Sequence, residues 1–108
     1  MTRDLTHIEP RALEIAGKIA AAVQPKQIIL FGSRARGDAR PDSDYDFLLI
    51  YDGPLNHHDC AVAAHRAIGR RRFSVDVMVQ SSEDFEYFRH ARSSIANHAD
   101  REGVICHG

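Results

Sequence analysis

The stretch Gly32–Asp46 reads GSRARGDARPDSDYD, and it decides the fold of this 108-residue chain. Directly before it, the apolar run Gln27–Phe31 is too short for a helix and rich in strand-forming residues, so it predicts a buried strand. At the end of the stretch, Asp44 and Asp46 open a second predicted strand, residues 45–51. Side chains two positions apart on a strand project to the same face, so the two carboxylates should lie side by side.

A third carboxylate lies within the next apolar run. Phe73–Val79 predicts another strand, and Asp76 lies at its centre. Burying an unpaired carboxylate costs free energy, so Asp76 is an unusual residue for such a strand. If this strand neighbours the second, Asp76 faces Asp44 and Asp46, and three converging carboxylates repel one another unless protons or cations neutralise them. Hard oxygen ligands of this kind suit Mg²⁺, and two such ions can clamp a phosphoryl group during in-line displacement.

Gly32 and Ser33 supply the complementary part of a site. A strand that ends in Gly-Ser and runs into a short helix leaves backbone N–H groups and a hydroxyl pointing beyond its end, which suits the outer phosphates of a nucleotide. The pattern is not a P-loop, because the lysine of GxxxxGK[ST] is missing. Arg34 follows directly and is predicted to reach triphosphate oxygens, whereas the role of Arg36 stays open. Each piece alone is common in turns and solvated loops, and only their combination indicates a nucleotide site.

These residues resemble the nucleotidyltransferase superfamily of DNA polymerase beta, whose pattern is Gly-Ser, a spacer, Asp-x-Asp and a third acidic residue on a later strand. Ten residues separate Ser33 from Asp44, as in the GSx10DxD form of the minimal nucleotidyltransferases (MNT), the small partners in HEPN/MNT toxin–antitoxin pairs. The surrounding Phe31–Leu49 and the closing Arg101–Val104 also look like that family. The resemblance covers roughly residues 27–104, with a motif core at 27–79.

The resemblance implies a role for each motif residue. Asp44, Asp46 and Asp76 would be the catalytic carboxylates and the ligands of two Mg²⁺ ions, with Asp76 best placed to help deprotonate an incoming hydroxyl. Gly32 and Ser33 would hold the β- and γ-phosphates of ATP. The hydroxyl would attack the α-phosphate, and pyrophosphate would leave. In the family's best-supported role the acceptor is a tyrosine of the cognate helical HEPN ribonuclease toxin, which adenylylation silences, so the chain would be an antitoxin.

Two other functions stay open. The chain has no additional domain of the kind that holds the acceptor in polymerases and aminoglycoside nucleotidyltransferases, so a small-molecule nucleotidyltransferase would need a second subunit to complete its acceptor site. A non-catalytic antitoxin would act by binding and occluding its toxin. The presence of Gly32-Ser33 together with Asp44, Asp46 and Asp76 counts against occlusion, because occlusion requires none of these residues.

The rest of the chain predicts helices around a small sheet. Residues 6–10 predict a helix start, with a possible capping box from Thr6 to Glu9 and Pro10 within the first turn, and Pro25 stops that helix. Asn56 is predicted to cap a helix that reaches about Gly69. The inner face of that helix is predicted from its apolar residues, Ala61, Ala64, Ala67 and Ile68.

The C-terminal third predicts two more helices and a short strand. One helix is capped by Ser81 or Ser82 and contains Phe85 and Phe88, and the other lies around residues 95–101. Gly103 fits a helix C-terminus, and residues 104–106 can add a last strand. The expected fold is therefore a single α/β domain over residues 1–108, a small mixed β-sheet flanked by helices. The resemblance implies the polymerase beta-like nucleotidyltransferase fold.

The composition narrows the function classes. The chain has 14 basic and 15 acidic residues, so it lacks the basic excess of a dedicated nucleic-acid or membrane-surface module. No apolar run approaches the roughly 18 residues that span a bilayer. The two cysteines form no CxxC motif and the histidines show no zinc-ligand spacing, so we expect a cytoplasmic protein with free thiols.

Arg70–Arg72 is interpreted as a solvated basic patch or a partner-docking surface, and Phe85, Tyr87 and Phe88 as helix packing rather than a platform for stacking bases.

Overall fold

Four strands form one mixed sheet in the order β3-β2-β1-β4 in the computed structural model, which describes residues 1–108. β1 (Gln27–Phe31) pairs antiparallel with both β2 (Tyr45–Ile50) and β4 (Val104–His107). β2 also pairs in parallel with β3 (Val75–Gln80), so β3 forms one edge of the sheet. The optional last strand is therefore present, and it closes the other edge.

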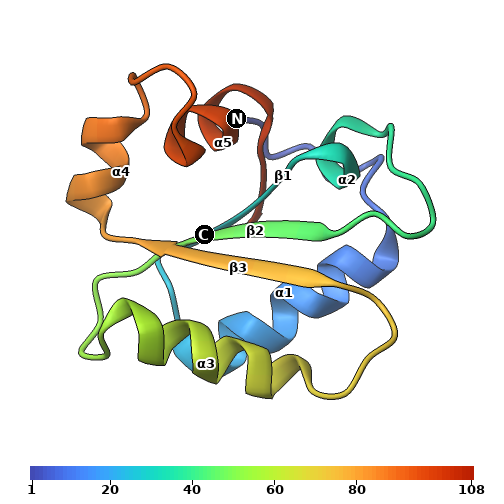
Figure 1. Ribbon diagram of the computed structural model, residues 1–108, viewed down its shortest axis with the longest axis horizontal. Coiled ribbons are helices and arrows are strands. Elements are labelled where there is room, and N and C mark those ends of the chain that lie inside the picture. The colour runs from blue at the N-terminus through green and yellow to red at the C-terminus, as the bar shows by residue number, and fades with distance from the viewer.

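Helices cover both faces of the sheet (Figure 1). α1 (Pro10–Val23) and α3 (His57–Ile68) lie together on one face. α2 (Ser33–Arg36), α4 (Ser82–Phe88) and α5 (Ile95–Glu102) lie on the other face. The predicted α/β class, a small mixed sheet flanked by helices, is confirmed. None of the helices has the length and apolar character that crossing a bilayer requires.

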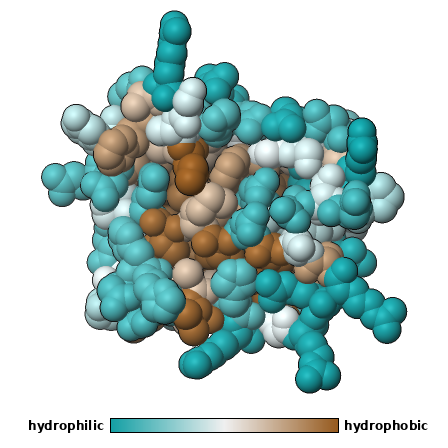
Figure 2. Space-filling model, in the orientation of Figure 1, coloured by the Kyte–Doolittle hydropathy of each residue, from teal (hydrophilic) through white to brown (hydrophobic).

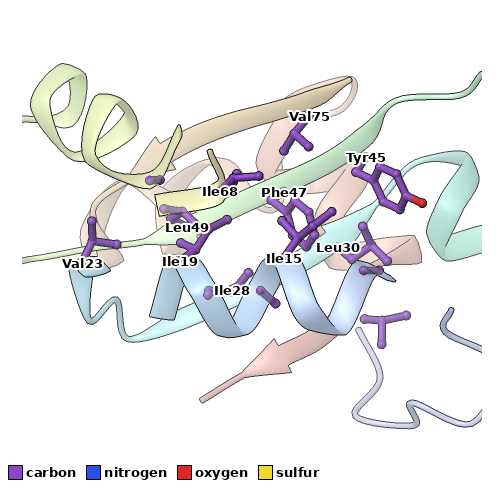
Figure 3. Packing of buried hydrophobic residues seen from close by; sticks show 14 of the residues in the cluster. Ile15, Ile19, Val23, Ile28, Leu30, Tyr45, Phe47, Leu49, Ile68 and Val75 are labelled. Atoms are coloured by element: carbon purple, nitrogen blue, oxygen red, sulfur yellow. The ribbon is translucent and has the colours of Figure 1, made fainter. Parts of the chain in front are cut away.

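The larger hydrophobic cluster fills the space between the sheet and the helices α1 and α3 (Figure 3). Phe47 and Leu49 of β2 belong to this cluster. Leu48 and Ile50 point the other way, into a second cluster that α4 and α5 cover. Because both faces of the central strands are covered, residues 28–31 of β1 and 47–50 of β2 are continuous apolar runs. Asp46 has the same parity as Leu48 and Ile50, so its side chain lies on the α4–α5 side of the sheet.

The start of α1 differs from the predicted capping box. The N-cap residue is Glu9, which makes no side-chain capping bond, and Pro10 is the first helical residue. The Thr6 hydroxyl and backbone N–H both donate to Asp4 Oδ1 instead. Since Pro10 has no N–H group, it needs no cap, and the fixed φ angle of its ring is already suited to the first helical turn.

The inner face of α3 is rotated relative to the prediction. Its buried residues are Cys60, Ala64 and Ile68, spaced four residues apart, whereas Ala61 and Ala67 are partly exposed. The predicted Asn56 cap is confirmed, because Asn56 Oδ1 accepts a 2.8 Å hydrogen bond from the backbone N–H three residues later. The sequence prediction passed over Cys60, which packs as a small apolar side chain.

The C-terminal part contains one confirmed prediction and one correction. Gly103 is the C-cap residue of α5, as predicted, although its φ of −73° and ψ of 155° are extended rather than left-handed. Tyr87 and Phe88 were predicted to pack within the fold, yet 75% of Tyr87 and 41% of Phe88 is exposed, and only Phe85 of this helix is buried. The short α4 has one inward face, and Phe85 fills it.

Candidate functional site

Three predicted site elements meet at one end of the sheet. β1 ends where the antiparallel β2 begins, and Phe31 is the strand partner of Asp46. β2 and β3 run in the same direction, and Asp46 is the strand partner of Asp76. Directly paired residues project to the same face, so Asp46 and Asp76 lie side by side on the α4–α5 face. Asp44 stands at the same end, exposed, one residue before β2 begins.

Burial and neighbouring negative charge together set the protonation of Asp46. Burial, followed by the charges of Asp76 and Asp44, raises the pKa of Asp46 from 3.8 to about 6. Arg36 opposes this shift but does not cancel it. A half-buried carboxylate beside two others is more stable when protonated or when bound to a cation.

Asp76 itself is exposed, which corrects the expectation of a buried carboxylate. β3 is an edge strand, so one side of it faces solvent, and its apolar residues Val77 and Val79 are also only partly buried. Figure 2 shows hydrophobic surface across the middle of the view, with hydrophilic side chains around it. The apolar run therefore reflects a partly covered edge strand, and Asp76 pays no large desolvation cost there.

The donor set fits a hard divalent cation. Asp46 and Asp76 offer paired carboxylate oxygens, and burial together with the charges of Asp76 and Asp44 raises the pKa of Asp46. No three Asp, Glu, His or Cys side chains converge closely enough in the structure to hold one ion. Asp44 lies within electrostatic reach of the pair, so its side chain would have to move inward to join them.

Gly32 brings the predicted phosphate-binding turn into contact with Asp46. Its φ is +77°, and a Cβ atom there would lie 2.5 Å from Asp46 Oδ2, so only glycine fits both the conformation and the space. The Gly32 backbone therefore lies directly against the Asp46 carboxylate. Ser33 is the first residue of α2 and is partly buried.

Arg34 has other partners than the predicted triphosphate. Its guanidinium donates to the Ser43 carbonyl at 2.9 Å and 3.2 Å, to the Pro41 carbonyl at 3.2 Å and to Glu9 Oε1 at 3.2 Å. It also stacks over the Tyr45 ring, 4.3 Å from the centroid. These contacts anchor the loop that carries Asp44, so a phosphate contact would require Arg34 to give up some of them.

Sequence reasoning missed Glu102. Its Oε1 accepts a hydrogen bond from the Gly32 N–H at 3.3 Å, and its Oε2 accepts one from Arg36 Nη1 at 2.8 Å. The only signal was the closing stretch Arg101–Val104, which supported the resemblance without assigning a role. No local pattern indicates that the end of α5 contacts the end of β1.

The largest cavity, about 470 Å³, lies away from the carboxylates. Its lining includes Gln27 and Ile50, which lie at the other end of β1 and β2, together with residues of α4. None of the cavities is lined by Gly32, Ser33 or the three aspartates. The carboxylates therefore lie outside the cavities of the protein, and Asp44 and Asp76 are exposed at the surface.

The raised pKa of Asp46 predicts how stability depends on pH without divalent cations. The folded-state pKa of about 6 lies above the ordinary 3.8, so the folded protein binds this proton more tightly than the unfolded chain. The resulting stability is complete below about pH 4 and is lost as the pH rises through about 6, a change of about 1–2 kcal/mol after allowing for partial exposure. Unfolding in urea with EDTA, at intervals between pH 4 and 7.5, measures it.

Asp46→Asn provides the control for this measurement, because asparagine does not titrate. The difference in unfolding free energy between the variant and the natural protein should grow from pH 4 to 7.5, in favour of the variant. A difference that stays constant over this range would contradict the assignment.

Comparisons with known proteins bear on the family and the fold. A family model described as a nucleotidyltransferase domain matches residues 13–100. No curated protein matches the chain. A crystal structure described as a toxin–antitoxin with AMP-PNP superposes with a TM-score of 0.59 at 21% identity, covering 89% of this chain and 73% of the other. A Sulfolobus solfataricus protein assigned as a nucleotidyltransferase superposes with a TM-score of 0.50 at 22% identity, covering 88% and 78%. At these identities the two structures support the fold.

Proposed function

Because this chain belongs to the nucleotidyltransferase domain family, we propose that it transfers AMP from ATP to a hydroxyl group of a partner protein. The observation that carries the proposal is the row formed by Asp46 and Asp76 on adjacent strands, with the Gly32 turn in contact with Asp46. Carboxylates that can hold a cation and a turn that can hold phosphate are thus adjacent. The catalytic residues fall within 27–79 of a domain that spans the chain.

In the proposed reaction, Gly32 and Ser33 bind the β- and γ-phosphates and orient the α-phosphate towards the carboxylates. The acceptor oxygen attacks the α-phosphorus and forms a new P–O bond, while the bond between the α-phosphorus and the bridging oxygen breaks and pyrophosphate leaves. Asp76, the exposed member of the pair, accepts the hydroxyl proton. Its exposure on the edge strand lets a bulky acceptor reach it.

Asp44, Asp46 and Asp76 are the residues that would hold Mg²⁺, two ions in the family pattern. Bound there, Mg²⁺ would neutralise charge on the triphosphate and on the departing pyrophosphate. Arg34 supports this arrangement through the Ser43 carbonyl, one residue before Asp44. We therefore assign Arg34 to positioning the Asp44 loop, with any phosphate contact secondary to that role.

The open site favours a protein as acceptor, because no cavity beside the carboxylates would enclose a small one. The similarity to a structure described as a toxin–antitoxin supports an antitoxin role. We propose that the partner is a helical HEPN-type toxin, that a tyrosine hydroxyl receives the AMP, and that the modification silences the toxin. Both cysteines are free, in keeping with a reaction in the reducing cytoplasm.

Intact-mass spectrometry tests the proposal. The helical protein encoded beside this chain is incubated with it, ATP and Mg²⁺, and its mass is expected to rise in steps of one AMP. The Asp44→Asn plus Asp46→Asn variant should still bind that protein without changing its mass. If the variant forms the complex and silences the toxin as well as the natural protein does, occlusion is the mechanism instead. Pyrophosphate release without a mass change would indicate a small-molecule acceptor.

A further inference from the structure

We propose that Glu102 occupies the position of the outer phosphates in the nucleotide-free protein, and that the β- and γ-phosphates of ATP displace its carboxylate from Gly32 and Arg36. The inference rests on the proposed function, because it assumes that the Gly32 turn binds a triphosphate. It adds a residue that sets nucleotide affinity and a phosphate-binding role for Arg36.

The two oxygens of Glu102 bind two separate donors. Oε1 accepts from the Gly32 backbone N–H at 3.3 Å, and Oε2 accepts from Arg36 Nη1 at 2.8 Å. These donors come from the end of β1 and from α2, while Glu102 is the last residue of α5. A carboxylate that bridges a backbone N–H and a guanidinium makes the contacts that a phosphate would make there. The turn therefore already binds an anion in this structure.

Arg36 lies within reach of both the turn and the carboxylate pair. Its hydrogen bonds to Glu102 and Asp38 raise the pKa of Arg36, with the Glu102 bond as the largest cause. Its positive charge in turn lowers the pKa of Asp46. The Arg36 side chain is 46% exposed, against 21% for that of Glu102, so Arg36 is the freer partner. A triphosphate bound in the turn can replace Glu102 as the partner of the Arg36 guanidinium without a change in the backbone.

Ser33 offers a further donor in the same place. Its hydroxyl makes no hydrogen bond to the protein, whereas those of Ser43, Ser81 and Ser94 accept hydrogen bonds from the backbone. A triphosphate could thus accept hydrogen bonds from the Ser33 hydroxyl, the Gly32 N–H and Arg36. Of these three donors, Glu102 occupies only the Gly32 N–H and Arg36. Removing the Glu102 charge should strengthen triphosphate binding, because the competing anion is lost.

The test is calorimetric titration at constant ionic strength with Mg²⁺, using AMP-PNP and AMP as probes. Glu102→Gln keeps the side-chain size but loses the charge, and it should bind AMP-PNP about 5- to 10-fold more tightly than the natural protein. Its affinity for AMP, which lacks the outer phosphates, should stay within about twofold. Arg36→Gln should bind AMP-PNP about 10-fold more weakly. Glu83→Gln, the same charge change on exposed α4, should alter neither affinity.

Weaker or unchanged AMP-PNP binding by Glu102→Gln would overturn the proposal, since Glu102 would then hold Arg36 in place for the nucleotide or have no part in binding. An equal gain for AMP would overturn it too, because that pattern is a general charge effect. The natural protein offers a second readout, in which the Gly32 amide resonance should shift with AMP-PNP and stay in place with AMP. A complete lack of AMP-PNP binding by the natural protein and every variant would instead contradict the proposed function.

Discussion

Asp46→Asn is expected to lower AMP transfer by about 10³-fold or more while making the cation-free protein more stable at neutral pH. The loss follows from the place of Asp46 between the Gly32 turn and Asp76, where it would hold Mg²⁺ against the triphosphate. The gain follows from removing a half-buried charge that two other carboxylates repel. The rate of AMP incorporation into the partner and the unfolding free energy in EDTA measure the two effects.

Asp42→Asn is the matched control for this prediction. Asp42 lies in the same loop as Asp44, is exposed and makes no hydrogen bond or ion pair, so the charge change is the same without the site contact. Its transfer rate should stay within about twofold of the natural protein. Comparable losses in Asp42→Asn and Asp46→Asn would show that net charge, rather than a placed carboxylate, matters.

Gly103→Ala is expected to destabilise the protein by about 3 kcal/mol, because the added methyl group has no space. Its Cβ would lie 2.2 Å from the Ala99 carbonyl oxygen and 2.5 Å from Ile29 Cγ2. The first contact is with backbone, and the second is in the buried centre of β1, so neither can yield easily. To relieve these two contacts, the end of α5, including Glu102, would have to move. Thermal unfolding should show a midpoint lower by about 10 °C or more.

Gly17→Ala is expected to change the stability in the opposite direction. Gly17 is an exposed residue of α1 with nothing within 4 Å of its Cβ position, so alanine there should stabilise the protein by about 0.5–1 kcal/mol through helix propensity. Equal effects at the two glycines would contradict the packing account of Gly103.

Most of the fold could be predicted because its signals are local. The apolar runs at 27–31 and 45–50 sit between turn residues, and both form the central strands. The Asn56 cap begins α3, and Ser81 and Ser94 cap α4 and α5 through the same kind of bond to a nearby N–H. The predicted inner face of α3 was wrong by part of a turn, because alanine side chains fit equally well in the interior and at the surface. The burial of Cys60 sets which face of the helix packs against the core.

The sequence predicted the exposure of a side chain less well where that exposure depends on which other helices and strands pack beside it. The sequence places Tyr87 and Phe88 on a helix beside Phe85, but only the tertiary structure shows that this helix buries one aromatic ring. It places Asp76 in an apolar run, but only the sheet order shows that the run is an edge strand. Periodicity states which residues share a face and does not state whether anything covers that face.

The sequence by itself determined the order of the elements and the candidate set Gly32, Ser33, Asp44, Asp46 and Asp76, because strand, turn and motif signals are contained within short segments. The tertiary structure alone decided that Asp46 and Asp76 are paired in register and that Glu102 binds Gly32. It also decided that Gly103 is needed for close packing rather than for its conformation. These features join segments 30 and 70 residues apart. Such contacts are set by how strands and helices pack in space, and no periodicity within a single segment records them.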